Sequence, residues 1–188
     1  VLAVVVGVTL LPPETSDRIS SVAGATDVET SLVHDTSFRG RFAENVTAIR
    51  MPYRTSSPES VTHADLVISQ AGIRAETVDI SAAVDGLAGA LPERPDAARL
   101  GNVMARMRMI TLFDRSAALG ALPLGTGNKS ERLFGYFTWH ADDSPPVNPL
   151  GDLYKTQVWA LARHLGVPAA IIDKPASADL EQGQTDEG

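Results

Sequence analysis

Residues 124–153 read LGTGNKSERLFGYFTWHADDSPPVNPLGDL, and this stretch carries the strongest indication of the fold. A short apolar run at 122–124 leads into the polar turn 125–128, after which residues 129–137 regain helical spacing. This order predicts a strand, a tight turn and the N-terminus of a helix. Backbone N–H groups and the positive end of a helix dipole favour anions at such a junction, so the stretch is typical of a nucleotide phosphate site.

Glu131, on the first turn of the predicted helix, has two interpretations. Its carboxylate oxygens suit a hard cation. Alternatively, Asn128 or Ser130 caps the helix and Glu131 completes a capping box. Spacing alone favours the cap, and it leaves the metal site open.

Strand-like and helix-like runs alternate along the rest of the chain. The predicted strands cover residues 1–8, 45–51, 76–80 and 122–125, and the predicted helices cover 57–71, 81–91 and 97–119. This alternation predicts an α/β fold: a Rossmann-like parallel β-sheet with helices on both faces.

In such a fold, ligands bind beyond the carboxyl ends of the strands. We therefore expect the turn after Val8, the segment MPYRTSSPES at 51–60 and the segment GTGNKSE at 125–131 to converge. The second of these is either a rigid polar loop that faces a ligand or a solvated connection with a helix cap at Ser57.

The composition is that of a globular protein. With 188 residues, of which 44% are hydrophobic and 21% charged, the chain is expected to form a single domain over 1–188. The absence of cysteine excludes disulfides and thiolate metal sites. A net charge of −7 argues against nonspecific nucleic-acid binding. The apolar start at 1–8 is too short to span a bilayer, so we expect no membrane segment and a cytoplasmic protein.

Two further segments carry cations that an anionic ligand would need. Arg106 and Arg108 lie in the long helix 97–119, where they bind a pyrophosphate or simply extend to solvent from an interface helix. Lys155 begins a helix with an apolar stripe, and a lysine there is more often a solvated charge.

Four blocks occur in order: GTGNKSE, GYFT, NPLGDLYKTQVWALARHLGVP and KPASADLEQGQTDE. Together they closely resemble the ammonia-dependent NAD synthetases, over roughly residues 45–188. The resemblance implies an adenine nucleotide alpha hydrolase-like fold and a homodimer. It also implies a carbon–nitrogen ligase that uses ATP and Mg²⁺ to adenylylate deamido-NAD, after which ammonia displaces AMP. No side chain is expected to act as a covalent nucleophile.

The resemblance also implies roles for individual residues. The implied ATP contacts are Thr126, Lys155 and Ser177, with Arg50 and Ser56 beside the adenosine. Glu131 corresponds to a magnesium ligand and Arg106 to a contact of deamido-NAD.

Two positions depart from the family on the side of deamido-NAD. Trp139 stands where many members have a lysine, and Pro146 stands where they have an aspartate. Neither can make the same contact. The same segment offers His140, Asp142 and Asp143 instead, which either shift the recognition by a few residues or mark a sub-branch of the family.

The larger departure follows the first strand, where related enzymes have a Ser-Gly-Gly-x-Asp-Ser loop that holds pyrophosphate. Here Thr9 is followed by Leu10 to Pro13, whose adjacent prolines lack N–H donors. Ser16 and Asp17 are only a faint echo of the loop. We therefore expect an atypical segment over about 9–44, and a C-terminus truncated at Gly188.

Two functional classes follow. The first is a NAD synthetase, and the alternative is an inactive or nucleotide-binding, dimerising relative that has lost the pyrophosphate loop. Another ATP pyrophosphatase of the same fold, such as a GMP synthetase domain or a tRNA-thiolating enzyme, is a third class. The GQTDE and NPLGDLYKTQV blocks argue against it.

Overall fold

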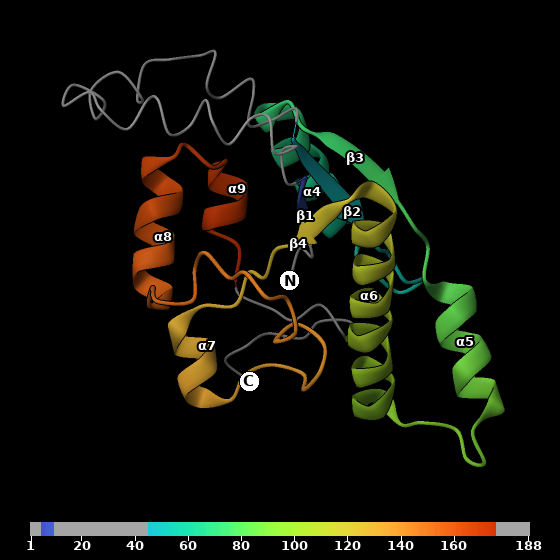
Figure 1. Cartoon of the computed structure of the whole chain (residues 1–188). Helices are drawn as coiled ribbons and strands as arrows, with labels where there is room; N and C mark the ends of the chain where they lie inside the picture. Colours follow the sequence, from blue (N-terminus) through green and yellow to red (C-terminus); the bar gives the residue numbers. More distant parts are fainter. Residues whose placement is uncertain (1–4, 10–44, 176–188) are drawn as a thin grey trace.

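The computed structural model describes residues 5–9 and 45–175, and of 5–9 it describes the backbone alone. Its centre is a four-stranded sheet in the order β3-β2-β1-β4 (Figure 1). The strands are β1 (Val5–Thr9), β2 (Val46–Arg50), β3 (Arg74–Thr77) and β4 (Ala121–Pro123). Helices connect and cover these strands, which confirms the predicted α/β class.

The strand directions agree with the predicted parallel sheet except at β1. β2 and β3 pair in parallel, whereas β1 is antiparallel to both β2 and β4, with Val5 opposite Ile49 and Gly7 opposite Pro123. β2, β3 and β4 therefore point the same way, and β1 points the other way.

The direction of β1 corrects one expectation about the site. Thr9, at the end of β1, pairs with Ala121 at the start of β4. An antiparallel strand presents its carboxyl end at the opposite edge of the sheet. The carboxyl end of β1 thus lies at the end of the sheet away from Leu124, while the carboxyl ends of β2 and β4 lie together as expected.

Helix α4 (Pro58–Ala71) confirms the helix predicted over 57–71. The Oγ of Ser57 accepts the N–H of Ser60 at 3.1 Å, and Pro58 occupies the first turn, where its missing N–H costs nothing. Gly72 ends the helix with a φ of 64°, a conformation that few other residues adopt. The capping interpretation of Ser57 is therefore confirmed.

The connection from β3 to β4 contains α5 (Ser81–Ala90) and α6 (Ala97–Leu119). Asp96 caps α6 by accepting the N–H of Arg99 at 2.8 Å, and Gly120 ends it with a φ of 61°. The prediction of 97–119 is confirmed. The third strand was placed too late, because Asp79 accepts the N–H of Ser81 at 2.7 Å and turns the chain into α5.

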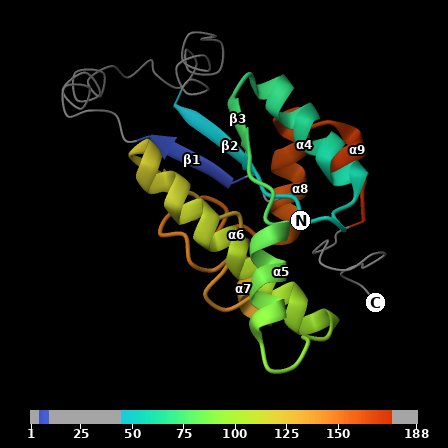
Figure 2. The same cartoon turned by 90° about the vertical axis from the view of Figure 1, so that its right-hand side faces the viewer.

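Helices lie on both faces of the sheet, with α4 on one side and α6 on the other (Figures 1 and 2). The buried apolar core joins the end of β2 to α5 and α6. It consists of Ile49, Met51, Tyr53, Ile80, Val84, Met104 and Leu112. Among the helices that the structure describes, none is both long and apolar enough to cross a membrane.

Between β4 and residue 175 the structure has three short helices: α7 (Lys129–Phe134), α8 (Lys155–His164) and α9 (Ala169–Ile172). The helix predicted over 129–137 ends early because Gly135, with a φ of 69°, caps it. Helices α8 and α9 lie beside α4 in Figures 1 and 2, and Gln70 Nε2 donates to the carbonyl oxygen of Gly166 at 2.8 Å.

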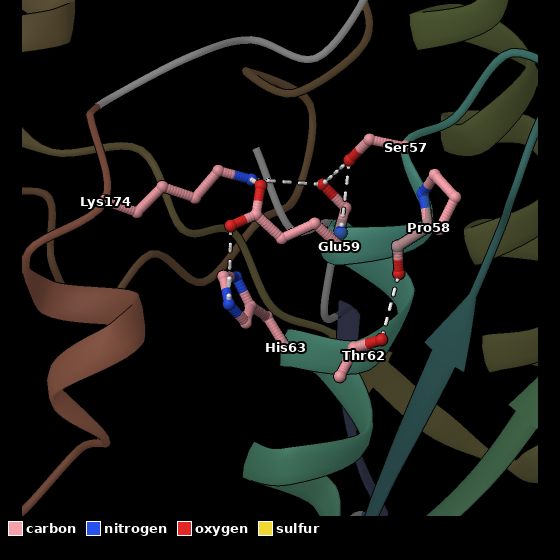
Figure 3. Close-up of polar contacts among 7 residues, drawn as sticks. Ser57, Pro58, Glu59, Thr62, His63 and Lys174 are labelled. Carbon is pink, nitrogen blue, oxygen red and sulfur yellow. Dashed lines mark hydrogen bonds and ion pairs between the residues drawn. The ribbon is translucent and has the colours of Figure 1, made fainter.

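A second contact joins the segment after α9 to the other end of α4 (Figure 3). Lys174 Nζ lies 3.4 Å from Glu59 Oε2 and 3.5 Å from Ser60 Oγ. His63 Nε2 lies 3.9 Å from the other oxygen of Glu59. Contacts at both ends of α4 thus hold the α8–α9 unit against it.

Candidate functional site

The turn 125–128 leads from β4 into α7 and is closed by a capping box. Asn128, only 2% exposed, accepts the N–H of Glu131 on Oδ1 at 3.1 Å. In return, Glu131 Oε2 accepts the N–H of Asn128 at 2.8 Å. The capping interpretation of Glu131 is confirmed, but it accounts for only one of the two carboxylate oxygens.

Three hydrogen bonds join residues 125–130, in the turn and the start of α7, to residues 147–155, in the loop before α8 and its first residue. The N–H of Gly125 donates to Val147 O at 2.8 Å, and the N–H of Lys129 donates to Leu153 O at 2.8 Å. The N–H of Lys155 then donates to Ser130 Oγ at 3.1 Å. The GTGNKSE and NPLGDLYK blocks are therefore neighbours, and the first turns of α7 and α8 lie side by side.

Asn148 packs beneath the turn and was missed by the sequence reasoning. A Cβ added to Gly125 would meet Asn148 Cγ at 3.4 Å, and one added to Gly127 would meet Asn148 Nδ2 at 3.3 Å. The two glycines leave room for this side chain, and their spacing was the signal that could have pointed to it. Asn148 Oδ1 is buried and has no hydrogen-bond partner in the described structure.

Glu131 and Lys155 face each other across the two helix starts. Lys155 Nζ lies 3.5 Å from Glu131 Oε1, and their side chains are 36% and 26% exposed. Thr126 is exposed in the turn that precedes them. The structure thus brings a carboxylate, an ammonium group and a hydroxyl residue from two blocks to one edge of the sheet.

Among the described residues, Glu131 is the carboxylate that could bind a metal ion at this place. Within residues 5–9 and 45–175, no group of three or more His, Cys, Asp or Glu side chains could hold an ion. Mg²⁺ tolerates such a site, because it keeps several waters and commonly binds one or two carboxylates together with substrate phosphates. Glu131 Oε1 is a hard oxygen that its cap leaves available, so the residues fit a magnesium ion that a nucleotide shares.

Arg50 lies at the carboxyl end of β2, on the edge that also holds the turn after β4. Its guanidinium is paired with Asp65 of α4, and its Nε is buried without a partner in the described structure. Ser56 accepts the N–H of Tyr53 at 3.1 Å and so holds the turn before α4. Neither contact is with Glu131 or Lys155, and both ATP assignments stay predictions.

Arg106 and Arg108 leave α6 in different directions. Arg106 is exposed and donates from Nε to Trp139 O at 3.1 Å. Arg108 is partly buried and donates from Nε to Met51 O at 3.2 Å, beside the end of β2. Arg106 therefore connects α6 to the segment after α7, where the deamido-NAD contact is expected.

The carboxylates in that segment hold its backbone. Asp142 Oδ1 accepts the N–H of Thr138 at 2.8 Å, and Asp143 Oδ1 accepts the N–H of Ala141 at 3.1 Å. Desolvation raises the pKa of the Asp142 carboxyl, and the charges of Asp143 and Glu131 act in the same direction. Both carboxylates therefore stabilise the backbone of this segment, and their part in deamido-NAD recognition stays a prediction.

Trp139 is 65% exposed next to His140, whose φ is 58°. Their rings meet edge to face with centroids 5.7 Å apart.

Ser177, the segment 10–44 and the predicted C-terminal truncation lie outside the described residues.

Comparison with known proteins shows the family to which the chain belongs. The family model described as NAD synthase matches residues 20–188. The NH(3)-dependent NAD(+) synthetase of Chlorobaculum parvum is 52% identical over 162 residues, which cover 85% of this chain and 57% of that protein. The synthetase of the same description from Fusobacterium nucleatum is 46% identical over 144 residues, 77% of this chain and 55% of that protein.

Solved structures give the same result. The NMN synthetase of Francisella tularensis has a TM-score of 0.72 at 33% identity, covering 75% of this chain and 59% of that one. The NH3-dependent NAD synthetase of Campylobacter jejuni has a TM-score of 0.68 at 30% identity, covering 86% of this chain and 74% of that one. The chain spans 57% of the length of the first curated relatives it matches.

Proposed function

Because this chain belongs to the NAD synthase family, we propose that it carries the ATP-binding part of an ammonia-dependent NAD synthetase. The proposed reaction joins ammonia to the nicotinate carboxyl of deamido-NAD, consumes ATP and requires Mg²⁺. Its products are NAD, AMP and pyrophosphate. The observation that carries the proposal is the meeting of Glu131 and Lys155, from two separate blocks, at the carboxyl edge of the sheet.

The chemistry explains why this edge needs positive charge. A carboxylate oxygen attacks the α-phosphorus of ATP, the bond from that phosphorus to the bridging oxygen breaks, and pyrophosphate leaves. Ammonia then forms the carbon–nitrogen bond and AMP leaves with the carbon–oxygen electrons, while the surplus protons pass to solvent. The first step brings two anions together, so Lys155 and a cation beside Glu131 would stabilise the charge on the pyrophosphate.

The remaining residues have proposed roles around this centre. Thr126 is exposed in the turn beside Glu131, which supports a contact with ATP. Arg50 would lie near the adenosine at the end of β2. Ser177, which follows α9 in the sequence, is proposed as a further ATP contact. Arg106 would meet deamido-NAD, because it reaches toward Trp139 from α6.

We also propose that two copies associate through α6 and that the protein works in the cytoplasm. Arg106, Ile110 and Phe113 are spaced as neighbours on one helical face, and Ile110 and Phe113 are 54% and 38% exposed. Exposed apolar side chains of this kind support an interface between copies. A deamido-NAD contact on the same face would then lie at or near that interface.

The acceptor carboxylate has one specific alternative. Trp139 and Pro146 replace the lysine and aspartate expected on the side of deamido-NAD. One structural neighbour is described as an NMN synthetase, and an amidation that forms NMN starts from nicotinate mononucleotide, a smaller acceptor. Both acceptors present the same nicotinate carboxyl to ATP.

The test measures AMP formed from ATP, Mg²⁺ and ammonium with deamido-NAD, with nicotinate mononucleotide or with no acceptor. We expect acceptor-dependent AMP, at a low rate and with weak ATP binding, because the sequence lacks the Ser-Gly-Gly-x-Asp-Ser loop. AMP release that ignores the acceptor would contradict the proposed reaction. ATP binding without any AMP would favour the nonenzymatic relative.

A further inference from the structure

We propose that, without ligands, Lys155 competes with the metal ion for Glu131, so that the nucleotide must withdraw Lys155 before the metal binds tightly. This inference rests on the proposed function, because it concerns the same ATP site. It adds a role for Lys155 beyond phosphate binding: its ammonium group takes the place of the metal ion at the carboxylate.

The capping box determines which oxygen of Glu131 a metal ion can use. Oε2 accepts the N–H of Asn128 at 2.8 Å, and that bond closes the first turn of α7. Oε1 is the oxygen that faces Lys155 Nζ at 3.5 Å. Oε1 is therefore the oxygen that a cation can bind without sharing it with the cap, and it is also the oxygen that faces Lys155.

The contact between the two side chains is suited to exchange. A separation of 3.5 Å is longer than a short charge-assisted hydrogen bond, and both side chains are partly exposed. The backbone of Lys155 stays in place, because its N–H donates to Ser130 Oγ at 3.1 Å. The flexible four-carbon stem of lysine can therefore move the ammonium group while α8 remains docked.

Charge gives the exchange its direction. With Lys155 beside Glu131, an approaching divalent cation meets a carboxylate that is already neutralised. ATP phosphates offer the Lys155 ammonium group a higher density of negative charge than the Glu131 carboxylate does. When the ammonium group moves to the phosphates, Oε1 of Glu131 becomes free for the cation. Metal and nucleotide should then promote each other's binding, since coupling between two ligands is reciprocal.

The test titrates Mn²⁺, a spectroscopic substitute for Mg²⁺, into the whole chain and follows free Mn²⁺ by electron paramagnetic resonance. The variants are Lys155→Met, which keeps the aliphatic stem and removes the charge, and Lys129→Met as the matched control. Lys129 Nζ lies over the Tyr154 ring, 4.9 Å from its centroid, on the same first turn of α7 as Glu131. The control therefore removes an equal charge nearby without touching Glu131.

Without nucleotide, we expect K155M to bind Mn²⁺ about three- to fivefold more tightly than the unchanged chain, the effect of removing one partly exposed charge. K129M should change the affinity by less than about twofold. Unchanged affinity in K155M, or equal gains in both variants, would overturn the competition. Near-ultraviolet circular dichroism shows whether each variant has kept its fold, and Lys155→Gln is a second neutral variant.

A second arm repeats the titration with α,β-methylene-ATP, which cannot be cleaved at the reacting bond. The unchanged chain should gain more Mn²⁺ affinity from this nucleotide than K155M does, because only the unchanged chain has Lys155 to withdraw. If the nucleotide does not bind while K155M alone still binds Mn²⁺ more tightly, the proposed function fails and the competition at Glu131 stands.

Discussion

Lys155 Nζ lies 3.5 Å from Glu131 Oε1, and this contact joins the first turns of α8 and α7. Both residues belong to blocks that resemble NAD synthetases, yet neither block alone indicates that the two side chains meet. The backbone hydrogen bond from Lys129 to Leu153 O, at 2.8 Å, makes them neighbours. A helix cap and the proposed metal site therefore share one carboxylate.

Two substitutions of Glu131 separate these roles. Glu131→Gln keeps an amide oxygen that can accept the N–H of Asn128, so stability should hardly change while Mn²⁺ binding falls. Glu131→Ala removes the acceptor as well and should lower the free energy of unfolding by about 1 kcal/mol. Urea denaturation and metal titration measure the two effects. Equal metal binding in E131Q and the unchanged chain would show that Glu131 is only a cap residue.

The position of Asn148 predicts which of the glycines around it can better be replaced by alanine. A Cβ at Gly151 would lie 3.2 Å from the backbone oxygen of Asn148, whereas one at Gly127 would meet its side-chain Nδ2 at 3.3 Å. A side chain can move aside more easily than a backbone. We therefore expect Gly151→Ala to lower the free energy of unfolding by about 1–3 kcal/mol. Gly127→Ala should lower it by less.

The Asn148→Ala background tests the cause of this order. Removing the amide gives a Cβ at Gly127 room, so the cost of Gly127→Ala should fall there. The cost of Gly151→Ala should persist, because the backbone oxygen remains. The double-mutant cycle is measured by urea denaturation. Identical costs of Gly127→Ala in both backgrounds would show that Asn148 is not the obstacle.

Helix bounds could be predicted from the sequence because single residues mark them. Asp96 and Gly120 delimit α6, and Gly72 ends α4 in a conformation that glycine adopts readily. The direction of β1 could not be predicted, since a run such as VVVGV has the same apolar pattern in both directions. That direction is decided by pairing with β2 and β4, which are distant in the chain.

The candidate site could be predicted only in part, because the sequence indicates its members but not how distant loops pack around them. Resemblance identified Glu131 and Lys155 as members of one site, and their contact agrees with that grouping. Asn148 could not be found in this way, because its role depends on how the loop before α8 packs beneath the turn 125–128. The contact of Arg106 with Trp139 likewise depends on how the segment after α7 folds back toward α6.

The contacts of Lys174 predict that its substitution changes stability locally, around α9. Its ammonium group forms an ion pair with Glu59 at 3.4 Å and a hydrogen bond with Ser60 at 3.5 Å, and both contacts are partly exposed. Lys174→Met should therefore lower global stability by less than about 1 kcal/mol. Amide exchange of α9 should nevertheless become faster, while that of α6 stays the same. Gln70→Ala, which removes the bond to Gly166 O, is the control at the other end of α4. Unchanged exchange in α9 after Lys174→Met would show that this contact does not tether the helix.

Asp142 predicts how stability depends on pH in mildly acid solution. Desolvation raises the pKa of its carboxyl in the folded chain, so the folded state binds this proton more tightly than the unfolded state. The charged form costs stability above the raised pKa, and this cost disappears as pH falls through the raised value toward the ordinary one. Asp142→Asn is neutral at every pH, and its amide oxygen can still accept the N–H of Thr138. The variant should be more stable than the unchanged chain at neutral pH, with a gap that closes on acidification. Urea denaturation at stepped pH measures the gap, and a gap that stayed constant with pH would rule out the Asp142 carboxyl as its source.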